Sequence, residues 1–570
     1  MAEALFSLKE LPAPVVQRDH QKTNGVHYTP AELARFVARR GLETVASAET
    51  LAIFDPACGD GELLLAASEE ARVRDLAPPR LLGTDTDPAA VAEARQRLGQ
   101  ARAAQVTIRC EDFLSIPPPK ALHGAEIDLM ISNPPYVRTQ VLGAARAQDL
   151  ARQFDLRGRV DLYHAFVAAM TAYLPEQGVL ALLCSNRFLT TRGGSSLRGL
   201  LDGGYTLREI WDLGDSKLFD AAVLPAVVIA SRGSSVDATG EPTFVRVYEV
   251  ASDGGSSKEC ESLLQALDGG VSGSVQVGAK RLSIERGALA DSNPERPWQL
   301  SSPASASWLE LVRKHSVGRL REIGPLRVGI KTTADKVFIS DAWHELPDAL
   351  RPEPEVLRPL LTHHVAARWS GCYPESGGRM VLYTHETTSE GRRPINLAEY
   401  PRAAAYLEQH RDRLEGRKYV KKAGRLWYEI WVPQQPDKWA EPKLVWPDIS
   451  EEPRFFLDES GAVVNGDCYW LPCGTAANED IALMLAVANS TFTLTFYDIC
   501  CGNRLYAGRR RFITQYIENL PIPTASSEAR SEIAEMVALI RHSAPGGQAE
   551  TESALDIVIH RLFGVKKAPR

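Results

Sequence analysis

Residues 51–65 read LAIFDPACGDGELLL, a short apolar run that ends in an acid and two closely spaced glycines before a helical pattern begins. Glycine lets the backbone approach a ligand where a side chain would stand in the way. The stretch is neither G-x-G-x-x-G nor G-x-x-x-x-G-K-[ST], so it disfavours an ordinary dinucleotide or a nucleoside triphosphate as the ligand. It predicts a strand-to-helix turn that lines a different kind of ligand site.

Working outward from this turn, short apolar runs alternate with longer helical patterns. Residues 51–55, 80–85, 106–112, 127–132 and 179–185 each predict a buried strand. Strands alternating with helices of this length indicate an α/β fold with a doubly wound, mostly parallel sheet covered on both faces. In such sheets the ligands bind beyond the carboxyl ends of the strands.

Two of the predicted strand ends carry side chains suited to an adenosine. Asp85 can accept both hydrogens of a ribose diol, Asp112 can accept from an exocyclic amine, and Phe113 can pack on a purine. Each residue alone has a plainer explanation, since an acid after a strand often caps a helix and Phe113 can belong to the core. Taken together, the strand ends predict an adenosine without phosphates, and S-adenosylmethionine fits that description.

The fourth strand end is the sequence LMISNPPYVRT at 129–139, in which Asn133, Pro134, Pro135 and Tyr136 follow an apolar run. Two prolines end a strand because they donate no backbone hydrogen bonds. The Asn133 side-chain oxygen and the Pro134 carbonyl can accept both hydrogens of an adenine amine, which frees its delocalised lone pair and stabilises the charge that develops. Tyr136 offers a stacking face that contributes about 1–3 kcal/mol per base. The loop is predicted to be an adenine clamp, and it requires a base flipped out of the duplex.

Composition bounds the class of protein. A chain of 570 residues, 44% hydrophobic and 24% charged, is expected to be soluble and to form two or three domains. No apolar stretch reaches the length of a membrane span and the first residues do not resemble a signal peptide, so we expect a cytoplasmic protein without a membrane partner. The nine cysteines lack zinc-site spacing, which predicts no metal. With a net charge of -7, any nucleic acid must be bound by local basic patches.

The texture of the chain predicts where its domains begin and end. We expect a cofactor-binding catalytic domain over 1–255, a Gly-, Ser- and Pro-rich linker over 256–305, a further domain over 306–525 and a C-terminal helical segment over 526–570; the resemblance given below implies that 306–525 is a target-recognition, DNA-binding domain.

Basic clusters in the C-terminal half are the predicted contacts to DNA phosphates. Residues 411–425 hold seven basic and two acidic residues, and a solvated helix face explains them equally well. The candidate DNA-binding residues in these clusters are Lys421, Lys422, Arg504, Arg509 and Arg510, and the resemblance given below adds Lys331 and Thr333.

With FDPACGDGELL, the acid in GTDTDP, EDF and NPPY in this order, the chain resembles class I S-adenosylmethionine-dependent methyltransferases, and more narrowly the gamma-class, TaqI-like (Eco57I-like) DNA adenine-N6 methyltransferases. The likeness extends over roughly residues 25–525. It includes DLYHAFVAAMTAYLPEQGVLALLCSNRFL and, in the C-terminal half, VGIKTTADKVFI, LWYEIWVP, ANSTFTLTFYDI and ENLPIP, which look like the family's target-recognition domain.

The resemblance implies roles for further residues. It places Tyr28, Thr29 and Pro30 at the cofactor and Phe219 at a second stacking face opposite Tyr136, where core packing is the alternative for Phe219. The expected catalytic residues are Asn133, Pro134, Pro135, Tyr136 and Phe219. The expected cofactor contacts are Tyr28, Thr29, Pro30, Asp55, Pro56, Ala57, Cys58, Gly59, Gly61, Asp85, Asp112, Phe113 and Asn133.

The implied activity is site-specific adenine-N6 methylation of double-stranded DNA in a restriction-modification or phage-defence system. The implied enzyme is a monomer, and a cognate endonuclease that does not stay bound is a further expected partner. Two alternatives stay open: a methyltransferase of RNA or of a protein glutamine, since the same clamp can hold any planar amine or amide, and an inactive DNA-binding subunit of a defence complex.

Overall fold

The chain forms two compact units whose boundary falls between Ser302 and Pro303. The computed structural model describes residues 29–46, 50–116, 126–137, 139–157, 160–216, 218, 224–233, 241–250, 256–289, 291–371, 378–474, 476–502, 509–543 and 548–566. Three predicted site residues, Tyr28, Phe219 and Arg504, lie outside them.

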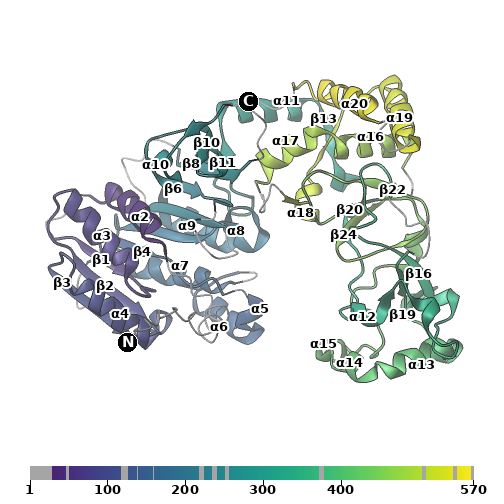
Figure 1. Cartoon of the computed structure of the whole chain (residues 1–570), viewed down its shortest axis with the longest axis horizontal. Helices are drawn as coiled ribbons and strands as arrows, with labels where there is room; N and C mark the ends of the chain where they lie inside the picture. Colours follow the sequence, from purple (N-terminus) through teal and green to yellow (C-terminus); the bar gives the residue numbers. More distant parts are fainter. Residues whose placement is uncertain are drawn as a thin grey trace, which may run out of the picture. The chain divides into compact units, whose positions relative to one another are not determined.

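The first unit is built on one long sheet (Figure 1). Among the described residues twelve strands join it, in the order β3-β2-β1-β4-β5-β7-β6-β8-β11-β10-β9, with β12 beside β11. Strands β3, β2, β1, β4 and β5 are parallel, and β7 lies antiparallel between β5 and β6. The predicted α/β fold with a mostly parallel doubly wound sheet is confirmed for this half. The strands are β1 (Ala52–Asp55), β2 (Arg80–Asp85), β3 (Gln105–Cys110), β4 (Leu129–Ser132), β5 (Val179–Ser185), β6 (Tyr205–Asp212), β7 (Pro225–Arg232) and β8 (Thr243–Glu249).

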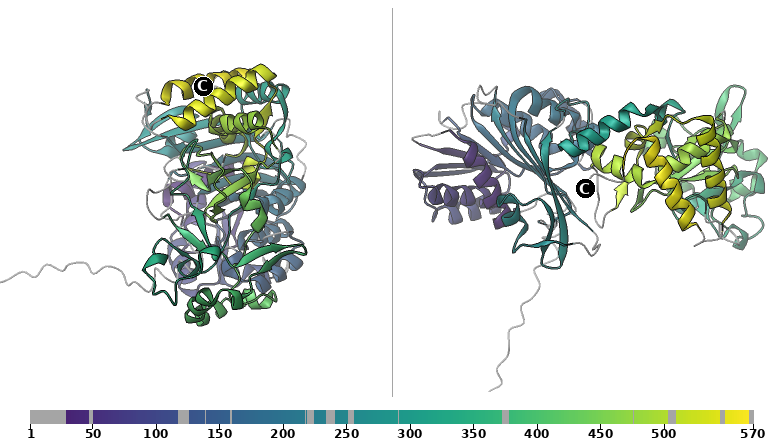
Figure 2. Two further views of the ribbon diagram at one scale, coloured as in Figure 1. Left: turned by 90° about the vertical axis from the view of Figure 1, so that its right-hand side faces the viewer. Right: turned by 90° about the horizontal axis from the view of Figure 1, so that it is seen from above.

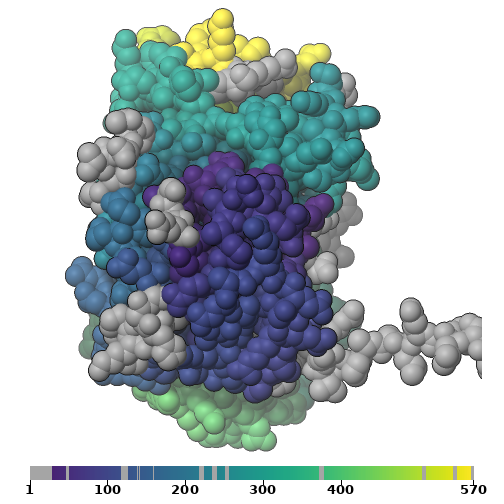
Figure 3. Space-filling model, turned by 90° about the vertical axis from the view of Figure 1, so that its left-hand side faces the viewer, coloured from purple at the N-terminus to yellow at the C-terminus, as the bar shows by residue number. Residues whose placement is uncertain are grey.

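Helices cover both faces of the parallel strands. Because side chains alternate along a strand, Ile53 of β1 joins the core under one set of helices while Phe54 joins the core under another. The helices of the first face are α2 (Ala31–Thr44), α3 (Glu62–Val73), α4 (Pro88–Leu98) and α10 (Leu263–Asp268), and those of the second include α6 (Ala144–Gln153), α7 (Leu162–Tyr173) and α9 (Ser195–Gly204). In Figure 3, α3 and α4 belong to the dark-blue surface of this unit.

The predicted linker over 256–305 is wrong, because this stretch extends the same sheet (Figure 2). It contains β9 (Lys258–Glu259), α10, β10 (Gly273–Val277), β11 (Lys280–Leu289) and β12 (Leu300–Ser301). Its glycines serve turns instead of a flexible connection: Gly270, Gly273 and Gly278 all have positive φ, and Gly278 lies in the turn between β10 and β11. A Gly- and Ser-rich composition therefore did not separate a hairpin from a linker.

The second unit begins at α11 (Pro303–Lys314) and contains small, mostly antiparallel sheets. Two four-stranded sheets have the orders β14-β24-β20-β22 and β15-β17-β16-β23. Their strands are β14 (Arg327–Val328), β15 (Ile339–Ser340), β16 (Leu357–Leu361), β17 (Met380–Leu382), β20 (Lys443–Pro447), β22 (Phe456–Asp458), β23 (Val463–Val464) and β24 (Cys468–Pro472). The two-stranded pairs join β13 (Ser316–Arg319) to β26 (Pro521–Pro523), β18 (His385–Thr388) to β19 (Gly391–Pro394) and β21 (Ile449–Ser450) to β25 (Arg510–Arg511).

Helices of the second unit complete its two cores. The C-terminal helices α19 (Ser527–His542) and α20 (Ala549–Leu562) share one core with α16 (Asn478–Asn489) and α17 (Thr491–Cys500), so the C-terminal segment belongs to this unit. Shorter helices pack on the other core or border it: α12 (Asp335–Phe338), α13 (Pro401–Gln409), α14 (Arg411–Glu415) and α15 (Lys418–Lys422). Within the described residues no single helix is long and apolar enough to cross a membrane. Helices α16 and α17 together have the length and composition of a span, but the chain bends by 64° at their junction. Nearly all of α16 is buried in the core of the unit.

Candidate functional site

A cavity of about 1000 Å³ lies at the carboxyl ends of β1, β2, β3 and β4 in the first unit. Its described lining brings together most of the cofactor contacts and the Asn-Pro-Pro-Tyr loop that the sequence predicts. Eight carboxylate side chains line it and, among the described lining residues, no lysine or arginine does. Such a lining suits a cationic ligand without phosphates. The acids are Asp55, Asp60, Glu62, Asp85, Asp87, Glu93, Glu111 and Asp112.

The turn after β1 shapes the floor of this cavity. Gly59 and Gly61 have φ of 52° and 84°, a conformation that side chains disfavour, and Gly61 is the residue before α3. The Cys58 backbone N–H donates to the Thr84 carbonyl at 2.9 Å, which ties the turn to β2. Cys58 is buried against Gly83, and burial raises the pKa of its thiol, so it acts as a small core residue.

Asp85 at the end of β2 is held by two backbone N–H groups. Gly59 donates to one carboxylate oxygen at 2.8 Å and Asp87 donates to the other at 2.9 Å. A carboxylate offers about four lone-pair positions, so both oxygens retain capacity for a ligand diol. Asp112 caps a short turn by accepting from the Leu114 N–H at 3.0 Å, and it also lines the cavity. Asp112 can therefore cap this turn and also face a ligand in the cavity.

Asp55, the last residue of β1, is 1% exposed. It accepts from the Ser132 hydroxyl at 2.8 Å and from the Ala57 N–H at 3.0 Å. Burial, reinforced by the charges of Asp85 and Asp60, raises the pKa of this carboxyl to about 7 despite those hydrogen bonds. Near neutral pH, Asp55 is thus poised between its neutral and anionic forms. Ser132 was not singled out from the sequence, although a polar residue closing the apolar run LMIS was an available signal.

The Asn-Pro-Pro-Tyr loop follows β4 directly. The Tyr136 hydroxyl donates to Asn133 Oδ1 at 2.5 Å, and Asn133 Nδ2 donates to Thr29 Oγ1 at 3.0 Å. Pro134 is buried, and the Tyr136 ring meets Tyr163 of α7 edge-on with centroids 6.2 Å apart. Burial raises the pKa of the Tyr136 phenol well above its usual value, so the hydroxyl stays protonated as a donor.

The chain after this loop is anchored to the start of α7. The Leu162 N–H donates to the Val137 carbonyl at 3.0 Å, and Asp161 accepts from the Thr139 N–H at 2.9 Å. These contacts join segments more than twenty residues apart, and no local sequence pattern predicted them. They hold the segment that follows the Asn-Pro-Pro-Tyr loop against the start of α7.

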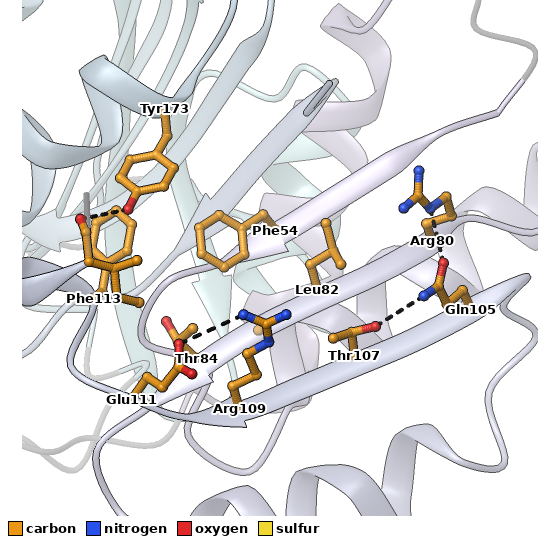
Figure 4. A pocket seen from close by; sticks show the side chains of 12 residues that line it. Phe54, Arg80, Leu82, Thr84, Gln105, Thr107, Arg109, Glu111, Phe113 and Tyr173 are labelled. Atoms are coloured by element: carbon orange, nitrogen blue, oxygen red, sulfur yellow. Dashed lines mark hydrogen bonds and ion pairs between the residues drawn. The ribbon is translucent and has the colours of Figure 1, made fainter. Parts of the chain in front are cut away.

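Phe113 is 2% exposed and packs against Phe54, Phe166 and Tyr173. It lines the large cavity and also a second, much smaller hollow of about 30 Å³ beside β2 and β3, drawn in Figure 4. Phe54, Leu82, Phe113 and Tyr173 form the apolar part of that hollow in Figure 4. Its packing makes Phe113 a core residue, and a contact with a purine stays a prediction.

Part of the basic stretch 411–425 is engaged by groups of its own unit. Arg411 pairs with Glu408 and Glu415 at 3.0 Å, and Lys421 pairs with Glu415 at 3.1 Å. Arg417 is 6% exposed and donates to the carbonyls of Thr332, Leu414 and Trp427. Fewer than seven basic residues of this stretch are therefore available to bind DNA. The exposed residues that form no ion pair in the described part of the chain are Arg413, Lys418 and Lys422.

The remaining DNA-binding candidates differ in their exposure and in whether an acidic residue already pairs with them. Arg510 forms a two-pronged ion pair with Asp498 at 2.7 and 2.8 Å, whereas Arg509 is exposed and lies 4.0 Å from Glu451. Lys331 and Thr333 are both exposed, and Thr333 has a φ of 58°, which is rare for a β-branched residue. The buried Arg417 donates to the Thr332 carbonyl of this loop at 2.9 Å. The segment with Lys331 and the segment with Lys418 and Lys422 are therefore neighbours.

The order of the parallel strands, the acidic cavity at their ends and the Asn-Pro-Pro-Tyr loop define a class I methyltransferase. Comparisons with known proteins agree. Residues 83–219 match the Eco57I restriction-modification methylase family, and residues 399–522 match the TaqI-like C-terminal specificity domain.

Relatives cover almost the whole chain. The type II methyltransferase M.BanIII of Aneurinibacillus aneurinilyticus is 38% identical over 96% of this chain and 98% of its own length. M.PaeR7I of Pseudomonas aeruginosa is 27% identical over 80% of this chain and 73% of its own length. The protein therefore belongs to the Eco57I- and TaqI-like type II methyltransferases, the DNA methyltransferases of restriction-modification systems.

Solved structures support the fold of the chain. The type IIL restriction-modification enzyme MmeI in complex with DNA matches with a TM-score of 0.61 at 15% identity, over 97% of this chain and 74% of that one. The DrdV–DNA complex matches with a TM-score of 0.51 at 12% identity, over 93% of this chain and 59% of that one.

Proposed function

We propose that this enzyme transfers a methyl group from S-adenosylmethionine to the exocyclic N6 amine of an adenine flipped out of duplex DNA. The observation that carries the proposal is that the Asn-Pro-Pro-Tyr loop and the acidic strand ends line one cavity. A hydrogen-bond acceptor for an amine and a site for a phosphate-free cation thus share one space.

The residues of the cavity fit the cofactor. Asp85 would hold the ribose hydroxyls, Asp112 would accept from the adenine amine of the cofactor, and Gly59, which lines the cavity, keeps this part of the turn free of a side chain. When bound, S-adenosylmethionine supplies a methyl group on a positively charged sulfur, and sulfur keeps the bonding electron pair when the methyl group leaves. The surrounding carboxylates, with Asp55 among them, favour such a positive charge.

The clamp acts on the target amine. Asn133 Oδ1 and the Pro134 carbonyl would accept its two hydrogens, so its lone pair is freed to form the new N–C bond as the C–S bond breaks. The same two oxygens stabilise the positive charge that develops on nitrogen, and one proton then leaves to water. Pro134 and Pro135 hold the acceptors still, and Tyr136 would stack on the base.

The second unit would position the duplex. The match to a specificity domain over residues 399–522 supports this role. Exposed lysines on and beside α15, namely Lys418 and Lys422, and the exposed Lys331 and Arg509 would meet phosphates, which position DNA without reading its sequence.

The deciding experiment is methyl transfer from labelled S-adenosylmethionine to unmethylated genomic DNA, followed by nucleoside analysis, with Asn133→Ala in parallel. N6-methyladenine from the wild type, with a loss of about a hundredfold or more in the variant, is the expected result. N4-methylcytosine would overturn the choice of base, label in RNA or protein would overturn the substrate, and no label anywhere would favour an inactive DNA-binding subunit.

A further inference from the structure

The catalytic amide is held from two sides by hydroxyl groups. Asn133 Nδ2 donates to Thr29 Oγ1 at 3.0 Å, and Asn133 Oδ1 accepts from the Tyr136 hydroxyl at 2.5 Å. Thr29 lies 104 residues before Asn133. The resemblance placed Thr29 at the cofactor, and its contact with the catalytic side chain is an additional finding.

We infer that Thr29 is a positioning residue for methyl transfer: it holds the Asn133 amide with its oxygen toward the target amine. The inference rests on the proposed function of the clamp. It gives Thr29 a role in the chemical step that is separate from any contribution to cofactor binding.

Which end of the amide faces the substrate decides whether the clamp works. The torsion that turns an asparagine amide is broad and roughly two-fold, so rotation by half a turn exchanges oxygen and nitrogen. With Nδ2 toward the base, two donors would face one another and the amine would keep its lone pair delocalised. Thr29 Oγ1 accepts from Nδ2 while the Tyr136 hydroxyl donates to Oδ1, and the two contacts together stabilise this orientation of the amide; a hydroxyl can donate as well as accept, so the Thr29 contact alone does not select it.

The same hydrogen bond also acts on the electronic state of the amide. In a low-dielectric site, hydrogen bonds in a chain polarise one another. Donation from Nδ2 to Thr29 raises the negative charge on Oδ1, the atom on which positive charge from the target amine would act. Position and polarity therefore change together when the Thr29 hydroxyl is removed.

Thr29 is well placed to hold another side chain still. It precedes Pro30 and α2, whose first turn is closed by the Ala34 N–H donating to the Pro30 carbonyl at 2.9 Å. Helix α2 buries Leu33, Phe36 and Val37 in the core of the first unit. A β-branched threonine is also stiff at χ1, so its hydroxyl has few alternative positions.

The test compares Thr29→Val, which keeps the shape and removes the hydroxyl, with Thr29→Ser, which keeps the hydroxyl. Both are made in the full-length chain and assayed for equilibrium binding of S-adenosylmethionine and for the single-turnover rate at saturating cofactor and DNA. The expected result for Thr29→Val is a rate about tenfold or more below wild type with cofactor affinity changed less than about threefold. Thr29→Ser should restore the rate to within about threefold of wild type.

Two outcomes overturn the inference: a normal single-turnover rate in Thr29→Val, or a serine variant as slow as the valine variant. Weaker cofactor binding with a normal saturated rate would assign Thr29 to the cofactor alone. Should the valine variant fail to fold, Thr29→Ala against Thr29→Ser answers the same question. Failure of the proposed function is distinguishable, because the wild type itself would then form no N6-methyladenine.

Discussion

The two units use charge in opposite ways. In the first, eight carboxylates line one cavity whose described lining has no basic side chain; Arg97, from outside that lining, pairs with Asp60 and Glu62 only. In the second, four of the seven basic residues of the stretch 411–425 already donate hydrogen bonds to groups of the same unit. They are Arg411, Arg417, Lys421 and Arg425. Uncompensated charge, and not the number of charged residues, indicates where a ligand is bound.

The largest expected effect concerns a fully buried ion pair of the second unit. Lys443 Nζ lies 2.7 Å from Asp458, and both side chains are 0% exposed. Asp458→Ala leaves a buried charge without this partner and should destabilise the second unit by about 3 kcal/mol or more. Tryptophan fluorescence during denaturation reports it, since eight of the ten tryptophans follow residue 302.

Two further variants sharpen that test. Glu408→Ala removes an exposed partner of Arg411 and should leave the unfolding midpoint unchanged within error. Lys443→Met combined with Asp458→Leu should recover much of the loss. An unaltered tryptophan transition in Asp458→Ala would contradict the expectation, and cofactor binding should survive in all three proteins.

The next effect belongs to the first unit. Asp85→Ala removes a carboxylate from the cavity and should weaken S-adenosylmethionine binding about a hundredfold, since hydrogen bonds to charged groups contribute about 1.5–3 kcal/mol each. Calorimetric titration measures the affinity. Glu69→Ala is the control, because Glu69 of α3 lies outside the described lining of the cavity and pairs with Arg72 at 3.0 Å. Equal losses in the two variants would contradict a specific role for Asp85, and DNA affinity should be unchanged.

A smaller effect on DNA affinity should distinguish a lysine without an ion pair in the described structure from one that is ion-paired. Lys422→Ala should weaken DNA binding about tenfold at low salt and reduce the slope of log affinity against log salt by about 0.9, the value for one phosphate contact. Lys421→Ala should do less, because Glu415 already holds Lys421 at 3.1 Å. Binding titrations across a salt series compare the two, and identical slopes for Lys422→Ala and wild type would remove this lysine from the DNA surface.

The smallest expected effect is a pH dependence. The pKa of Asp55 is about 7, so the carboxyl is neutral below that pH and anionic above it. A cation binds the anionic form better, hence S-adenosylmethionine affinity should rise between pH 6 and pH 8 by at most about tenfold and then level off. The rise should be weaker for S-adenosylhomocysteine, whose sulfur is neutral, and absent in Asp55→Asn. A pH profile unaltered by Asp55→Asn would contradict this assignment.

Stability should follow the opposite trend at this residue. Burial raises the folded-state pKa of Asp55 above the value of 3.8 that an exposed aspartate has. The folded state therefore holds a proton that the unfolded state has lost across this interval, and the contribution of Asp55 to stability falls as pH rises from about 4 to about 7.

The parallel strands and their ends were predictable because apolar runs broken by Gly, Pro and Asp are local signals. The run predicted at 51–55 is β1 at Ala52–Asp55, and the run at 179–185 is β5. The extension of the sheet through β9–β12 was not predictable, since β9 and β12 have two residues each and glycines lie at the start of β10 and in the turn before β11. The family of the chain was predictable because its motifs occur in order along one stretch.

Contacts between polar side chains that are far apart in the sequence could not be predicted from local sequence patterns. Nothing near Thr29 indicates that its hydroxyl meets Asn133, and nothing near Arg417 indicates that its guanidinium is buried beneath the Thr332 carbonyl. Charge patterning along a helix shows where arginines occur but not which carboxylate or carbonyl each will meet. Such pairings depend on the tertiary fold, and they decide which candidate residues are free to bind a partner.

The hydrogen bond from Tyr136 to Asn133 Oδ1 has a consequence for the enzyme between substrates. An idle methyltransferase holding its reactive cofactor is exposed to every small amine that diffuses into the site. With its acceptor already satisfied by the protein, the resting clamp offers a stray amine little gain over water. Under the proposed function, a flipped adenine would bring a large ring that can stack as well as two donors, so a substrate of that size would engage the clamp and wasteful turnover of cofactor would be suppressed.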